Sequence, residues 1–140
     1  MTSGNNVEPD RIPIRSEADI VAVRRAAREL CAELGFSSTQ TTVVATAISE
    51  IARNIVVYAG FGEMTLRLVI DIDGVRRGIK VTATDRGPGI ANIPKAMQDG
   101  YTTGNGMGLG LPGARRLMDD FHIASAPGEG TTIVMTKWTP

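Results

Sequence analysis

The chain has 140 residues, 42% of them hydrophobic but only 4% aromatic, which predicts one domain with an aliphatic core. Its 15 basic and 15 acidic residues cancel and form no basic run, which argues against nucleic acid or a membrane surface as partner. The single cysteine, Cys31, rules out an intrachain disulfide and fits a reducing cytoplasm, and no apolar run reaches the roughly 20 residues of a membrane span.

The chain is expected to begin with a flexible tail (1–10), followed by a single domain (11–140). Residues 11–15 could form a short edge strand, because Pro13 cannot donate to a central ladder. A capping box at residues 16–19 opens a first helix, which ends at Gly35. Its apolar residues recur at helical spacing and predict a buried stripe of Ile20, Val23, Ala27, Leu30, Cys31 and Leu34.

A second helix is predicted from an N-cap within residues 37–40 to about Ala59, with Gly60 as its stop. The core stripe of this helix is predicted to be Val44, Ala47, Ile48, Ile51 and Ile55. At about 100° per residue, Glu50 and Asn54 share one flank of that stripe, where polar groups can face a cleft.

The rest of the chain is predicted to form strands, turns and two helices. The expected strands are 64–72, 78–84, 123–125 and 131–138, with turns at 73–74 and 127–130. The expected helices are a short one near 94–98 and one from Pro112 through Leu117 to Phe121, after a mobile glycine-rich loop at 99–110. His122 would then lie at a helix–strand junction as a structural residue. The fold class is therefore α+β: a two-layer sandwich with a mixed, mostly antiparallel sheet and helices on one face.

Glu50 and Asn54 form the first candidate motif, because residues four apart lie on one helix face. An ionised glutamate can act as a general base, and a carboxamide oxygen can bind Mg²⁺, which needs few protein ligands beside phosphates. The alternative is an ordinary solvent-facing flank. Arg53 lies about 100° from Asn54 and is expected to face elsewhere, as a surface or partner residue.

The turn Asp85-Arg-Gly-Pro-Gly89 is the second motif. It could be an ordinary strand-ending turn, since Asp, Gly and Pro all favour turns. Alternatively, Asp85 accepts a hydrogen bond from the exocyclic amine of adenine and rejects guanine, which has a carbonyl there. Gly87 and Gly89 would then let the backbone approach the base closely.

The third motif has glycine at four alternate positions, Gly104, Gly106, Gly108 and Gly110. It could be a flexible linker, or a lid whose amides wrap phosphates in front of the next helix. The segment Gly108–Gly113 also fits the dinucleotide pattern G-x-G-x-x-G, but no strand precedes it directly. No P-loop sequence is present.

These three motifs, in this order, resemble the GHKL (Bergerat-fold) ATPase superfamily, and within it the small anti-sigma-type serine/threonine kinases, above all the switch kinases of bacterial stressosomes. The resemblance covers about residues 10–138. The matching positions are Glu50 and Asn54 in the N box, Asp85, Gly87 and Gly89 in the first glycine box, Gly104–Gly110 in the second, and Gly130-Thr131 in the late Gly-Thr. In the family, the last threonine helps bind adenine, often through water.

The resemblance implies a cytoplasmic serine/threonine kinase that uses ATP and Mg²⁺, with Glu50 as the base and Asn54 on the metal. Its substrates would be STAS-domain scaffold or antagonist proteins of a stressosome. Once released by their phosphorylation, the kinase would bind and activate a downstream partner, in the best-known pathways a PPM-type phosphatase. The alternative is a non-catalytic, ATP-gated binding module or an anti-sigma factor.

Overall fold

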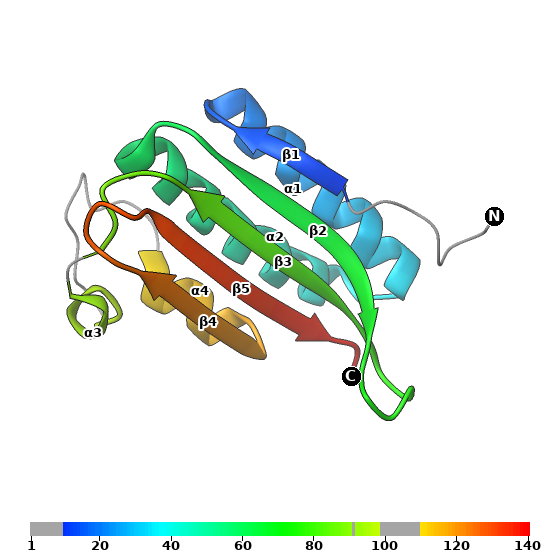
Figure 1. Ribbon diagram of the computed structural model, residues 1–140. Coiled ribbons are helices and arrows are strands. Elements are labelled where there is room, and N and C mark those ends of the chain that lie inside the picture. Colours follow the sequence, from blue (N-terminus) through cyan, green and yellow to red (C-terminus); the bar gives the residue numbers. More distant parts are fainter. Residues whose placement is uncertain (1–9, 91, 99–109) are drawn as a thin grey trace.

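The computed structural model describes residues 10–90, 92–98 and 110–140. These residues form one antiparallel sheet of five strands in the order β1-β2-β3-β5-β4, with α1, α2 and α4 against one of its faces (Figure 1). The predicted α+β fold class is therefore confirmed. The elements are β1 Asp10–Ile14, α1 Glu17–Leu34, α2 Ser38–Asn54, the π-helix η2 Ile55–Ala59, β2 Gly62–Ile70, β3 Arg77–Asp85, α3 Ile93–Ala96, α4 Gly110–Leu117, β4 Asp120–Ser125 and β5 Thr131–Trp138.

The two long helices begin differently. Ser37 caps α2 with a complete capping box: its hydroxyl accepts from the Gln40 amide (3.1 Å), and the Gln40 side chain accepts from the Ser37 amide (3.0 Å). The capping box predicted for α1 is wrong, because the Ser16 side chain caps no helix amide. The Asp19 carboxylate instead accepts from the amide of Arg15, at 2.8 Å.

The end of the second helix also differs from prediction. The α-helix ends at Asn54, and residues 55–59 continue as a π-helix, closed where the Gly60 amide donates to the Ile55 carbonyl at 2.8 Å. Gly60 has a φ of 81°, which suits glycine. Asn54 therefore stands at the junction of an α-helix and a π-helix. Single π-turns inside helices occur often at functional sites.

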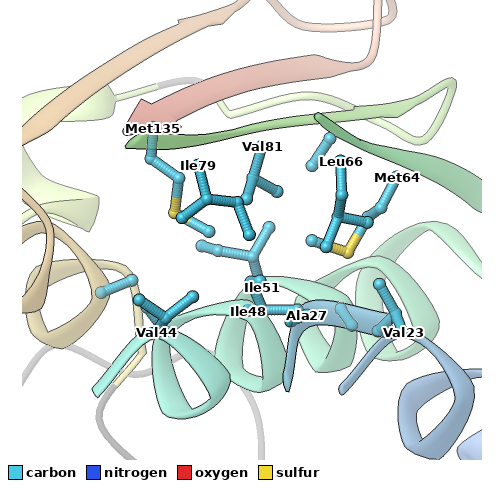
Figure 2. Packing of buried hydrophobic residues seen from close by; sticks show 14 of the residues in the cluster. Val23, Ala27, Val44, Ile48, Ile51, Met64, Leu66, Ile79, Val81 and Met135 are labelled. Carbon is cyan, nitrogen blue, oxygen red and sulfur yellow. The ribbon is translucent and has the colours of Figure 1, made fainter. Parts of the chain in front are cut away.

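The core lies between the sheet and the two long helices. Figure 2 shows Met64, Leu66, Ile79, Val81 and Met135 directed from the strands toward α1 and α2. The predicted helix stripes are confirmed as buried at Ile20, Val23, Ala27, Cys31, Leu34, Val44, Ala47, Ile48, Ile51 and Ile55, whereas Leu30 is only partly buried. Burial raises the pKa of the Cys31 thiol to about 11, against a lowering effect of the Thr41 side chain, as expected of a buried structural cysteine.

The chain leaves the last helix earlier than predicted. The α4 helix ends at Leu117, and Phe121 belongs to β4. Backbone and side chain of Asp119 both bond to β5: its amide donates to the Thr136 carbonyl (3.0 Å), and its carboxylate accepts from the Trp138 amide (2.8 Å). Pairing with β5 thus overrides the helical pattern. His122 consequently lies exposed on β4 rather than at a helix–strand junction.

One helical stretch, Ser38–Ala59, has the length and mean hydropathy (1.2) of a possible membrane span. Half of its apolar window is buried within the protein, and the core helix of a soluble protein passes the same test. It is therefore weak evidence for a membrane segment.

Replacing Ile48 by alanine tests the packing of α2. The side chain of Ile48 is fully buried, so Ile48→Ala should lower the free energy of unfolding by about 2–5 kcal/mol. The matched control is Val21→Ala on α1, where the side chain is 45% exposed and the change should stay within about 0.5 kcal/mol. Urea unfolding followed by circular dichroism measures both, and equal losses would contradict this account of the core.

Candidate active site

Glu50 lies on α2 and is only 8% exposed. One carboxylate oxygen, Oε1, accepts from the amide of Gly110 at 3.0 Å. The other, Oε2, is 3.4 Å from Nη1 of Arg53. Both oxygens are thus held, and the carboxylate faces the first residue of α4.

Arg53 was expected to face away from this flank, and that expectation is wrong. Residues three apart on a helix are neighbours, so Arg53 reaches back to Glu50 while 33% of its side chain stays exposed. The same spacing argument that paired Glu50 with Asn54 could have found this contact from the sequence.

Asn54 follows Glu50 by one turn and is half-buried. No hydrogen bond engages its carboxamide within the part of the chain that the structure describes. Over the same residues, no group of three or more His, Cys, Asp or Glu side chains could form a protein-only metal site. One unengaged carboxamide oxygen does fit Mg²⁺, which binds through few protein ligands plus phosphates and water.

Asp85 ends β3 beside Gly62 of β2 and Thr131 of β5, its register partners. Because alternate residues of a strand share a face, Asp85 lies on the helix-covered face with buried Ala83. Its Oδ1 accepts from the amide of Gly87 at 2.8 Å. Its Oδ2 has no partner among residues 10–90, 92–98 and 110–140, so one oxygen of a half-buried carboxylate is free to accept from a ligand.

The glycines of the turn after β3 are required by contacts within the chain. A Cβ on Gly87 would lie 2.7 Å from Cβ of Ala59, at the end of η2. Gly89 has a φ of 78°, and a Cβ there would collide with the carbonyl oxygen of Ala126. The predicted approach of this backbone to a purine ring stays a prediction, but close packing on two other segments already demands both glycines.

Sequence reasoning missed Ser125. This last residue of β4 is the register partner of Thr131, and their hydroxyl oxygens are 2.8 Å apart. The hydroxyl of Ser125 also accepts from the amide of Ile90 and contacts the carbonyl of Gly130, each at 2.8 Å. The strand register brings Ser125 to Thr131, and the docking of the turn brings Ile90 to Ser125; no local motif marks the serine.

The predicted lid, residues 104–110, lies only partly within the described residues. Gly104, Gly106 and Gly108 lie outside the described residues. Gly110 begins α4 with a φ of 67° and donates to Glu50. The helix predicted to start near Pro112 therefore starts at Gly110, and its first amide points at the candidate base.

A cavity of about 610 Å³ lies between α3, α4 and β4. It contains none of the predicted site residues. Its lining residues are Ile93, Pro94, Met97, Gln98, Arg115, Phe121 and Ile123. The candidate site is therefore defined by its polar groups and their contacts, not by this cavity.

The sequence pattern of the histidine kinase-like ATPase domain matches residues 13–137. The chain belongs to this family. The solved structure of the RsbU and RsbW domains of a Mycobacterium tuberculosis protein has the same fold, with a TM-score of 0.64 at 22% identity. That match covers 96% of this chain and 34% of the other.

Two curated relatives span most of the chain. It is 47% identical to the serine/threonine-protein kinase RsbT of Bacillus subtilis, over 91% of this chain and 94% of the relative. It is 31% identical to the anti-sigma F factor of Pasteuria penetrans, over 81% and 79% respectively. The chain is thus a serine/threonine kinase of this family, and the family implies the use of ATP.

Replacing Gly89 by alanine tests whether the turn is seated as described. A left-handed φ costs alanine about 1–2 kcal/mol, and the collision with Ala126 adds to it, so Gly89→Ala should cost more than 2 kcal/mol. Gly74→Ala is the matched control, because Gly74 has a φ of 69° but open space around the added carbon. Gly74→Ala should lose only the stability that the left-handed backbone conformation costs an alanine. Thermal unfolding compares them, and similar losses would argue against the packing of the turn on Ala126.

Proposed function

We propose that this kinase transfers the γ-phosphoryl group of ATP to serine or threonine residues of STAS-domain scaffold or antagonist proteins. Phosphorylation would release it to bind and activate a downstream output enzyme such as a phosphatase, in a partner switch within the cytoplasm. The observation that carries the proposal is the setting of Glu50: a buried carboxylate, one turn before an unengaged carboxamide, facing the start of α4. The relatedness to RsbT and to anti-sigma F factors supports the partner-switching class.

In this proposal Glu50 receives the hydroxyl proton of the acceptor while the acceptor oxygen bonds to the γ-phosphorus and ADP leaves. The contacts with Gly110 and Arg53 support this role, because they hold the carboxylate in one orientation. Asn54 would hold Mg²⁺, which neutralises phosphate charge when bound.

The nucleotide would lie between α2 and the strand ends. Asp85 would accept from the adenine amine through its free oxygen, with Thr131 beside it. The glycines would place backbone near the nucleotide: Gly87, Gly89, Gly104, Gly106, Gly108 and Gly110. Nucleic acid and membrane have no part in this function.

A second candidate is a binding module that is gated by ATP and transfers no phosphate, or an anti-sigma factor. The 31% identity to the anti-sigma F factor of Pasteuria penetrans is the observation that favours this alternative. Mass spectrometry of a STAS protein after incubation with Mg-ATP separates the two: a gain of phosphate supports the kinase, and binding without any gain supports the module.

Glu50→Gln tests the base. The carboxamide of glutamine still offers an oxygen to the Gly110 amide but cannot take the proton, so transfer to a STAS protein should fall at least about 100-fold. ATP binding should stay close to that of the wild type. Radiolabel transfer and calorimetry measure these two quantities. Full transfer by purified Glu50→Gln or Glu50→Ala would refute the assignment.

Asp85→Asn tests the adenine contact. Asparagine can keep the bond from the Gly87 amide while it replaces the free carboxylate oxygen by an N–H donor, which would oppose the adenine amine. We expect ATP binding to weaken by about 10- to 100-fold. Calorimetry with Mg-ATP measures the loss, and unchanged affinity would exclude Asp85 from the site.

A further inference from the structure

Ser125 joins three segments through its hydroxyl group. Its oxygen is 2.8 Å from the amide nitrogen of Ile90, which follows the glycine turn. It is also 2.8 Å from the carbonyl oxygen of Gly130 and 2.8 Å from the hydroxyl oxygen of Thr131. Three polar neighbours at this distance match the full capacity of a hydroxyl, which is one hydrogen and two lone pairs.

The chemistry of these neighbours fixes the direction of each bond. The amide of Ile90 can only donate, so Ser125 accepts from it. The carbonyl of Gly130 can only accept, so the single hydrogen of Ser125 goes there. The remaining contact must then use the hydrogen of Thr131, which donates to the second lone pair of Ser125.

Thr131 therefore has no hydrogen left for a ligand, and its oxygen can only accept. Directly beside it in the β3–β5 register lies Asp85, whose Oδ2 is also an acceptor without a partner in the described chain. Opposed residues of neighbouring strands have Cβ atoms only about 5 Å apart, so both oxygens can reach one small group. The strand ends present two acceptors side by side.

We propose that Ser125 is a specificity-determining residue: by holding the hydroxyl hydrogen of Thr131, it makes the base site complementary to a 6-amino purine and hostile to a 6-oxo purine. The amino group has two N–H donors for the two acceptors. A 6-oxo group carries no hydrogen and would place a third acceptor against these two, so no hydrogen bond could form at that position, which is costly in a half-buried site. This inference rests on the proposed placement of adenine at Asp85.

The experiment is competition binding of Mg-ATP and Mg-ITP to the full chain, which gives the ratio of their affinities. In Ser125→Ala the hydroxyl of Thr131 regains a free hydrogen that can turn toward a 6-oxo group. The preference for ATP over ITP should fall about fivefold to tenfold. Ser125→Thr keeps the hydroxyl and should keep the preference.

The ratio of the ATP and ITP affinities separates an effect on nucleotide selectivity from a loss of the anchor that holds the turn. Ser125 also anchors the turn through Ile90, and loss of that anchor would weaken both nucleotides equally. If Ser125→Ala weakens ATP and ITP by the same factor, the proposal is overturned. A second check uses Thr131→Val, in whose background Ser125→Ala should no longer change the ratio, because the proposed route runs through Thr131.

Three further outcomes are decisive. If Ser125→Ala fails to fold, the single variants of Thr131 decide: Thr131→Val should reduce the preference for ATP, which Asp85 alone would then maintain, and Thr131→Ser should keep it in full. An unchanged ratio in Thr131→Val overturns the inference. If the folded wild-type protein binds neither nucleotide, the proposed function itself fails. If it binds both equally, the function stands and the role of Ser125 falls.

Discussion

The site depends on the seating of one turn, residues 85–90, between two other parts of the chain. On one side Gly87 packs against Ala59 at the end of η2, and on the other the Pro88 carbonyl accepts from the Gly128 amide at 2.8 Å. These contacts tie the end of the helix that carries Asn54 to the strand ends that carry Asp85 and Thr131. Three polar groups from distant parts of the sequence therefore share one end of the sheet.

Most of the architecture could be predicted from local patterns. Helical periodicity identified the buried faces of α1 and α2, because one hydrophobic face against a sheet leaves a regular trace in sequence. The same periodicity placed Glu50 and Asn54 on one flank of the core stripe. Gly35 and Gly60 marked the ends of α1 and of the second helix, where the left-handed conformation favours glycine.

What could not be predicted depends on contacts between distant segments. The bonds of Ser125 follow from the pairing of β4 with β5 and from the docking of Ile90, and no local pattern carries either. The early end of α4 likewise reflects the attachment of Asp119 to β5. The π-helix after Asn54 carries no recognisable local signal. Arg53 is different, since its spacing of three residues from Glu50 is sufficient to predict their contact.

The close backbone contacts have a consequence for mutational scanning. Gly62, Gly87, Gly89 and Gly130 each lie so near other backbone or Cβ atoms that even a methyl group would meet them. A saturation library scored by growth would therefore rank these glycines as intolerant as Glu50, although a glycine has no side chain that could take part in the reaction. Intolerance to substitution at these positions reflects the close packing of the backbone and not a role in the reaction. Only variants that are scored separately for abundance and for turnover would distinguish the scaffold from the reacting groups.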